Sequence, residues 1–252
     1  IEKLLRISRG RKGDLISLAI GVLSTLLGLA LAKIHPILLP ITTSVTIYFI
    51  YFGDLADGRN WSAAIHVLEW ALTSSITLIC ITAIQGEEIG KLVLHGIKYR
   101  DEMFHWIETG LGAEGDPKLF LIPKIKELTV FSLLTLVSAG YLGLLLGSYL
   151  LNYMNYYVGC LFIHAKPGYT WIPIVFGWQI YAISRVIGYV NLGVVLSTPI
   201  ISKTLKVRYD KKKLKKQLLI AATAIIIDFI LKGTIANKIY QPILKKAIEV
   251  KG

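Results

Sequence analysis

The chain has 252 residues, of which 54% are hydrophobic and 17% charged, and its net charge is +12 at pH 7. Soluble domains are about 45–50% apolar and about 25% charged, so this composition excludes an ordinary soluble domain and a disordered chain. Only Cys80 and Cys160 are cysteines, and both lie in apolar runs, which excludes a disulfide-stapled secreted module. The basic residues form short clusters between apolar stretches, a pattern that indicates a membrane protein.

The first three apolar stretches predict three transmembrane helices. A cationic segment, residues 1–14, precedes the stretch from Leu15 to Ala32, which is too long for the apolar region of a signal peptide. A second span is expected from Pro36 to Phe52 and a third from Trp61 to Ile84. Each approaches the ~20 apolar residues that cross the hydrocarbon core of a bilayer.

Residues 85–126 form one extended polar interval. Within it, residues 86–110 alternate charged and apolar side chains at helical spacing, which predicts an amphipathic helix lying along the membrane interface. The charged face of this helix carries Glu88, Lys91, His95, Lys98, Glu102 and His105.

The later apolar regions leave the number of crossings open. Residues 128–165 are long enough for two crossings, although a belt of tyrosines favours one helix to about Asn152 and a short piece after it. Residues 171–201 are long for one helix. Their expected break points are Gly188, Asn191, Gly193 and Pro199. A last span is predicted from Leu218 to about Leu231, with the side chain of Lys232 extending to the membrane surface.

Charge placement predicts the orientation of the chain. The loop 203–216 carries eight Lys or Arg against one Asp, and residues 1–14 form the other basic cluster. The positive-inside rule places both in the cytoplasm, which requires an even number of crossings between them. We therefore expect an all-α, polytopic integral membrane bundle of six or seven transmembrane helices. It forms a single domain, residues 1–252, with one interfacial amphipathic helix.

Charges inside the apolar spans give the main functional signal. Arg185 lies in the middle of the 171–201 run, Asp228 lies in the last span, and His66 and Glu69 share one face of the third. A charge in hydrocarbon costs several kcal/mol, so such residues pair or serve a function. We expect Arg185 to pair with Asp228 or Glu69. The four residues then line an ion or solute path, or they form a purely structural intramembrane ion pair.

Two further sets of residues suggest ligands. The amphipathic helix carries potential metal ligands on one face, including a Glu-x-x-His spacing that di-iron bundles use, although a solvated helix face is the favoured explanation. These metal candidates are Asp101, Glu102, His105 and Glu108. Orientation of the chain in the membrane is the favoured role of the basic loop. Its lysines are also candidates to bind anionic lipid headgroups, at ~1 kcal/mol each near a membrane surface, or an acidic or nucleic-acid partner. These lysines are Lys211, Lys212, Lys213, Lys215 and Lys216.

Three functional hypotheses remain open on the sequence. The leading one is a small transporter or channel that moves an ion or small solute between helices. The others are a membrane-embedded enzyme acting on a lipid or isoprenoid substrate, and a non-catalytic membrane scaffold or assembly factor. The sequence has no phosphate-binding Gly-x-x-x-x-Gly-Lys motif, which argues against an ATP-driven motor. The sequence identifies no cofactor, no catalytic residue and no specific nucleic acid. Membrane lipids are the expected partners, and a homo-oligomer stays open.

Overall fold

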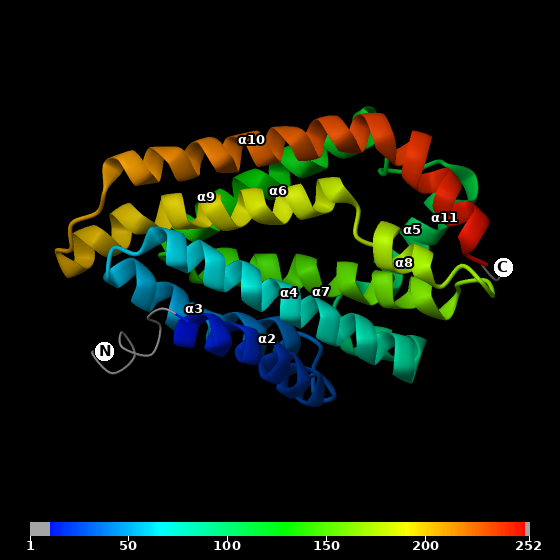
Figure 1. Cartoon of the computed structure of the whole chain (residues 1–252), viewed down its shortest axis with the longest axis horizontal. Helices are drawn as coiled ribbons and strands as arrows, with labels where there is room; N and C mark the ends of the chain where they lie inside the picture. The colour runs from blue at the N-terminus through cyan, green and yellow to red at the C-terminus, as the bar shows by residue number, and fades with distance from the viewer. Residues whose placement is uncertain (1–10, 250–252) are drawn as a thin grey trace.

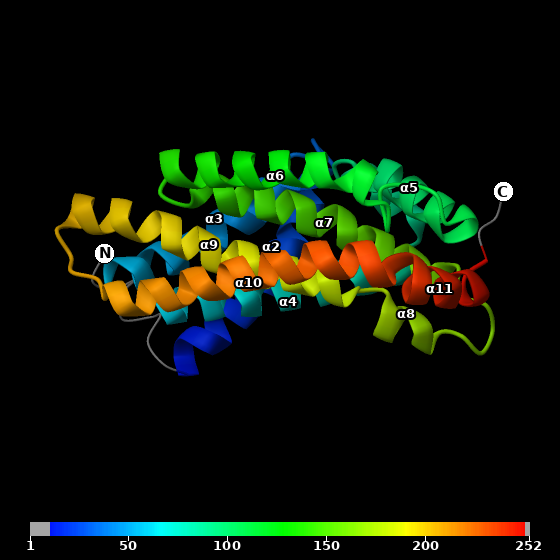
Figure 2. The same ribbon diagram turned by 90° about the horizontal axis from the view of Figure 1, so that it is seen from above.

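The structure, a computed structural model, describes residues 11–249 and is entirely α-helical in that range (Figure 1). Seven helices of 19 to 26 residues run back and forth along the long axis of the molecule. They are α2 (Arg11–Ala32), α3 (Leu38–Ala56), α4 (Asn60–Gln85), α6 (Pro117–Val137), α7 (Tyr141–Ile163), α9 (Ile180–Leu205) and α10 (Lys211–Ile235). Figure 2 shows α6 beside α7 and α9 beside α10.

The long helices have two distinct ends. At one, which we call the α5 end, the short elements gather: η1 (Glu87–Leu92), α5 (Gly96–Thr109), α8 (Trp171–Phe176), η2 (Ala236–Tyr240) and α11 (Gln241–Ala247). At the other, the basic end, the α3–α4 turn lies beside the start of α10. A hydrogen bond of 3.1 Å from Gln217 Nε2 to the Asn60 carbonyl joins the two. The basic residues of the α9–α10 loop therefore lie at the same end as the start of α4.

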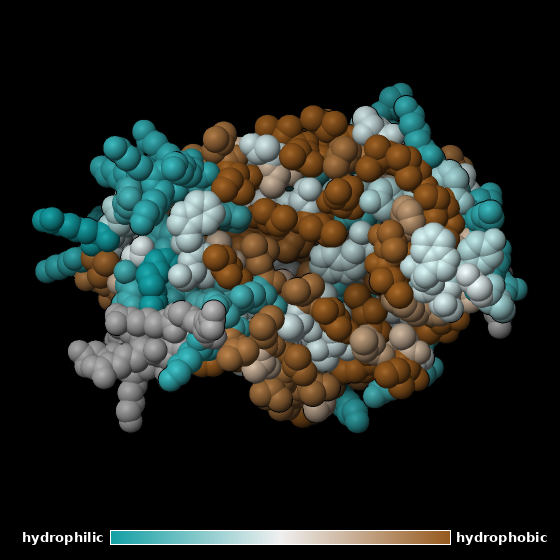
Figure 3. Space-filling view, in the orientation of Figure 1, coloured by the Kyte–Doolittle hydropathy of each residue, from teal (hydrophilic) through white to brown (hydrophobic). Residues whose placement is uncertain are grey.

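Five segments of the described chain are long and apolar enough to cross a membrane. They are Lys12–Ala32, Leu38–Ala56, Asn60–Gln85, Trp171–Leu205 and Lys211–Ala247. Large apolar side chains such as Leu23, Leu219 and Ile230 are exposed along them. Figure 3 shows apolar side chains across the middle of one face and a concentration of polar ones toward the left end. These features are those of a multi-pass membrane protein.

Helices α6 and α7 have the length of a span without its composition. Helix α6 carries Lys124, Lys126 and Glu127, and α7 carries Asn152 and Asn155. Both nevertheless pack within the bundle, α7 against α3 and α4, and α6 against α7 and α9. Lys124 and the two asparagines are buried. These two helices are therefore not among the candidate spans of the described residues, although Lys124, Asn152 and Asn155 face the protein interior.

The breaks between helices differ from those expected. The 128–165 region divides at Ala139 and Gly140, which have left-handed backbones (φ 51° and 101°), and not at Asn152. A side chain at Gly140 would meet Tyr51 at 2.7 Å, so the turn is also a close approach to α3.

Helix α9 continues through all four expected break points, and the chain breaks earlier, after α8 at residues 177–179. The expectation was wrong because the small residues serve packing. A Cβ on Gly188 would lie 2.8 Å from Ile225, so this glycine allows α9 and α10 to approach closely.

The amphipathic segment 86–110 consists of η1 and α5, which meet at His95, a residue with a left-handed backbone (φ 65°). The apolar face of α5 is buried within the protein, where it contacts α7 and α11. This face includes Met103, Phe104, Trp106 and Ile107. Protein packing therefore accounts for the amphipathic pattern of α5.

Candidate functional site

Six charged side chains lie close together inside the bundle, toward its α5 end. We call them the central charge network: Glu114, Lys124, Glu127, Arg185, Asp228 and Lys232. They come from the loop before α6 and from helices α6, α9 and α10. Lys124 forms an ion pair with Asp228, and Lys232 Nζ lies 2.7 Å from Glu114 Oε2. The side chains of these four residues are at most 10% exposed.

Arg185 joins the network from α9. Its Nη2 donates to the Met154 sulfur at 3.2 Å, and its guanidinium is in electrostatic contact with the carboxylates of Glu127 and Asp228. The hydroxyl of Tyr189, one turn further along α9, donates to Glu127 Oε1 at 2.9 Å. Asp228 is thus a neighbour of Arg185, but the direct ion-pair partner of Asp228 is Lys124.

The sequence contains a helix start signal ahead of Lys124 and Glu127. Treating residues 85–126 as one polar interval hides this helix. Asp116 caps α6 by accepting from the Lys118 amide at 2.9 Å, and Pro117 occupies the first turn, so a helix begins here. Spacings of three and four residues then place one set of side chains on a single face. This face carries Phe120, Lys124, Glu127 and Phe131.

Aromatic rings flank the charges of this face. The ammonium of Lys124 lies 5.8 Å from the ring centroid of Phe120 and 5.3 Å from that of Phe229. Phe131 stacks on Tyr189 with centroids 4.7 Å apart. The face is therefore half aromatic and half charged, and it points toward α9 and α10.

Lys232 corrects the expectation that its side chain extends to the membrane surface. It is only 7% exposed, because Glu114 from the loop before α6 covers it. Burial raises the pKa of Glu114, but the cations of Lys232, Arg185 and Lys124 together outweigh burial, so the pKa lies below its ordinary value. Glu114, which is distant from Lys232 in the sequence, thus takes the place of water as the partner of the Lys232 ammonium.

A cavity of about 70 Å³ lies next to the network. Polar groups of Tyr51, Thr135, Arg185 and Tyr189 contribute to its lining, and the remainder is largely apolar, including Leu144 and Leu151. Tyr51 donates a hydrogen bond of 2.9 Å to Ser197 of α9. The cavity therefore extends from the network to α3, in the direction of the basic end.

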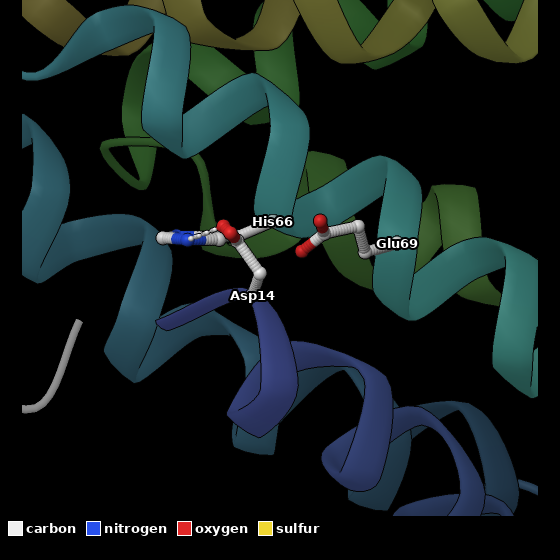
Figure 4. Close-up of side chains that lie close together, drawn as sticks. All are labelled: Asp14, His66 and Glu69. Atoms are coloured by element: carbon white, nitrogen blue, oxygen red, sulfur yellow. Dashed lines mark ion pairs between the residues drawn. The ribbon is translucent and has the colours of Figure 1, made fainter. Parts of the chain in front are cut away.

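A second cluster lies at the basic end, where α2 begins, α3 ends and α4 begins. We call it the His66 cluster; it comprises Asp14, Asp54, His66 and Glu69, and Figure 4 shows Asp14, His66 and Glu69. His66 Nδ1 lies 2.6 Å from Asp54 Oδ2, and His66 Nε2 lies 3.3 Å from Asp14 Oδ1. Arg59 Nη2 donates to Asp54 Oδ1 at 2.8 Å. One ligand-type atom from each of Asp14, His66 and Glu69 lies within 4.8 Å of the other two.

Close packing of α2 on α4 holds this cluster together. A Cβ on Gly21 would lie 2.7 Å from the Trp70 carbonyl oxygen, so only glycine permits this approach. Ser74 Oγ donates to the Gly21 carbonyl at 3.1 Å, and Ser17 Oγ donates to the Glu69 carboxylate. Small residues on α2 thus bring Asp14 to the face of α4 that carries His66 and Glu69.

The four path residues predicted from the sequence therefore fall into two groups. Arg185 and Asp228 belong to the central charge network, whereas His66 and Glu69 belong to the His66 cluster. Helices α3 and α4 connect the groups: Tyr51 and Val67 line the cavity, and their near neighbours Asp54 and His66 form the cluster.

The metal candidates in α5 do not converge. All four are exposed; Asp101 accepts from Arg100 Nη2 at 2.6 Å, and Glu102 lies 3.9 Å from Lys98. Within residues 11–249, the grouping of three potential ligands that the fold brings together is Asp14, His66 and Glu69. Sequence reasoning missed Asp14 and Asp54 because each belongs to a different helix from His66.

The five lysines expected to bind lipid headgroups are exposed in the first two turns of α10. Asp210 caps this helix by accepting from the amides of Lys212 (2.8 Å) and Lys213 (3.2 Å), and these backbone hydrogen bonds lower the pKa of Asp210. The chain thus combines a buried, charge-balanced network, a carboxylate-rich cluster and an exposed basic helix start. Comparison with known protein families, with curated proteins and with solved structures gives no match for this chain.

Proposed function

We propose that the protein is a small membrane transporter or channel whose seven long helices all cross the bilayer. An ion or small solute moves between α6, α9 and α10 along the central charge network. The path continues through the adjacent cavity toward the His66 cluster at the basic end.

The course of the helices supports seven crossings. Helices α2, α3, α4, α6, α7 and α9 precede the basic α9–α10 loop, which makes an even number of passes after the chain enters α2 at the basic end. The positive-inside rule then puts this end in the cytoplasm and the α5 end outside.

The central charge network is the observation that carries the transport proposal. Glu114, Lys124, Asp228 and Lys232 are buried, and Glu127 and Arg185 are half-buried, between helices that otherwise expose apolar side chains. A simple structural bundle gains little from them, since a well-packed apolar core is often as stable as a buried ion pair. Ionisable groups inside membrane helices that face the bundle interior mark ion and solute pathways.

Two buried polar atoms support a polar path here. Asp228 Oδ1 and the Tyr181 hydroxyl have no hydrogen-bond partner among the residues that the structure describes. Because a buried polar atom without a partner costs free energy, each favours an encounter with water or a polar solute. Both belong to elements that form the network, α9 and α10.

The largely apolar cavity supplies a gate between the two polar groups. A narrow apolar section in a polar path opposes conduction by excluding water until it widens. Gly140 and Gly143 line this cavity, and a Cβ on either would meet Tyr51 or Thr135, so this section is narrow. The path is therefore closed in this conformation.

Flux into vesicles tests the proposal. The purified full chain is reconstituted in liposomes, and imposed gradients of H⁺, K⁺ and Cl⁻ are followed with entrapped fluorescent indicators. We expect the protein to dissipate at least one gradient faster than empty vesicles do. Arg185→Gln and Asp228→Asn abolish this difference, because each removes a charge from the path.

A matched control separates the path from the surface. Lys216→Gln removes a charge from an exposed position on α10, the helix that carries Asp228, and leaves the flux unchanged. The absence of flux above empty vesicles for all three ions contradicts transport of common ions. Equal flux in the wild type and Asp228→Asn contradicts the assigned path.

A second candidate function, an enzyme acting on a lipid substrate, rests on a different observation. A groove of about 710 Å³ opens between α4, α7, α8 and α9 and is lined by apolar residues including Ile79, Phe162 and Trp178. Its size suits an acyl or isoprenoid chain. Turnover of a lipid substrate that Glu69→Gln abolishes, without any ion flux, would favour this candidate over transport.

A further inference from the structure

We infer that Asp14, His66 and Glu69 bind a divalent transition-metal ion such as Zn²⁺ or Mn²⁺ at the basic end of the bundle. The inference is independent of transport, because it rests on the chemistry and geometry of the cluster alone. Imidazole together with two carboxylates is a ligand set typical of Zn²⁺, Mn²⁺ and Fe²⁺.

The geometry of the cluster fits an ion. The three ligand atoms lie within 4.8 Å of one another. Ligands about 2.0–2.2 Å from a shared metal are separated by roughly 3–4 Å, so small side-chain rotations complete the site. Figure 4 shows the Asp14 carboxylate, from α2, lying between the imidazole of His66 and the carboxylate of Glu69, both from α4.

The orientation of His66 is the observation that separates this site from a mere group of acids. The His66 side chain is 3% exposed and the Asp54 side chain fully buried, and Asp54 Oδ2 engages His66 Nδ1 at 2.6 Å. A neutral imidazole held in this way carries its proton on Nδ1 and presents the lone pair of Nε2. Metal-binding histidines almost always donate their other ring N–H to a carboxylate, a backbone carbonyl or a water, and Asp54 is in the position of such an acceptor.

Arg59 extends this arrangement by one further step. It pairs with Asp54 at 2.8 Å, so the carboxylate that orients His66 is itself fixed. The guanidinium offsets the charge of Asp54, which leaves the two carboxylates of Asp14 and Glu69 beside the imidazole of His66. Two carboxylates in a half-buried place favour a divalent cation between them.

Access to the site comes from the basic end. The side chain of Asp14 is 45% exposed, whereas that of His66 is buried. An ion therefore reaches the carboxylates from water and loses its last waters to the imidazole.

Metal titration of the full chain in detergent micelles tests the inference. After removal of bound metal with a chelator, Co²⁺ is added and its visible absorption recorded, and Zn²⁺ binding is measured by calorimetry. We expect one ion per chain. Glu69→Gln and Asp14→Asn abolish metal binding while keeping the shape of the side chain. Asp54→Asn weakens metal binding about 10–100-fold, because it changes only the group that orients His66.

Matched controls and a fold measurement keep the outcome decisive. His105→Ala and Glu102→Gln alter exposed residues of α5 at the opposite end and leave binding unchanged. Zn²⁺ raises the Tm of the wild type and of both controls but not that of Glu69→Gln or Asp14→Asn, whose helical circular dichroism is intact. Equal Zn²⁺ uptake by wild type and Glu69→Gln overturns the inference. A wild type that binds no ion and whose His66 is an imidazolium paired with Asp54 and Asp14 also overturns it.

Discussion

The central charge network and the His66 cluster contain similar charged side chains but differ in how positive and negative charges are balanced. In the network, three carboxylates meet three cations, so the charges balance within the protein. In the cluster, three carboxylates (Asp14, Asp54 and Glu69) meet one guanidinium and an imidazole, and one carboxylate is half exposed to water. Balance permits complete burial, whereas an acidic excess requires solvent or a cation. The difference predicts that the net charge of a buried site, more than the number of its charges, decides whether the site binds a cation.

Breaking one pair of the network gives the largest expected effect. Asp228→Ala leaves the buried Lys124 ammonium without its partner and destabilises the folded protein by about 3–5 kcal/mol. The measurement is equilibrium unfolding of the reconstituted protein. The double variant Lys124→Met/Asp228→Leu recovers most of the loss, because no charge remains unpaired. A double variant no more stable than Asp228→Ala would show that the pair is not balanced as described.

A smaller effect is expected where helix packing holds the His66 cluster. In Gly21→Ala the added Cβ meets the Trp70 carbonyl oxygen at 2.7 Å, which separates α2 from α4 at a cost of about 1–3 kcal/mol. Thermal unfolding measures this cost, and Co²⁺ absorption reports whether Asp14 still reaches the site. Gly147→Ala is the matched control, since nothing lies within 4 Å of its Cβ. An equal loss of stability in both variants would contradict the role of Gly21.

The pH dependence of stability sharpens the comparison at the Glu114–Lys232 pair. The pKa of Glu114 is lowered in the folded protein, so its contribution is fully present above its ordinary value of 4.5 and is lost as the pH falls through the folded pKa. We expect the Tm difference between wild type and Glu114→Gln to be largest at neutral pH and to shrink below 4.5. Glu102→Gln, on the exposed face of α5, shows no such change. A difference that grows on acidification would contradict the lowered pKa.

The smallest effect is expected at the exposed cap of α10. Asp210→Ala removes the acceptor for the amides of Lys212 and Lys213, so these amides exchange hydrogen faster while the core is unaffected. Asp210→Asn keeps an oxygen acceptor and retains the protection. Hydrogen exchange followed by mass spectrometry distinguishes them. Unchanged exchange in Asp210→Ala would show that the side chain does not cap the helix.

Much of the fold was accessible from the sequence, because apolar length is a local property. The first three spans were predicted within a few residues, as the bounds of α2, α3 and α4 show. The second half of α6 lies in the apolar region predicted from Leu128, but its first half was missed because Lys124 and Glu127 made it look like part of a surface segment. The break at Gly140 was misplaced because a glycine in a turn and a glycine in a packed helix look alike without their neighbours.

The sequence by itself determined that the chain contains several apolar stretches of membrane-spanning length, that Arg185 and Asp228 lie inside two of them, and that a basic segment separates these two. Only the tertiary structure decided which charges meet. Lys124 and Asp228 are 104 residues apart, and Asp14 reaches His66 from another helix. Hydropathy and helical periodicity act over a few turns, whereas charge pairing depends on which helices pack together. For that reason the residues expected to form one path proved to belong to two sites.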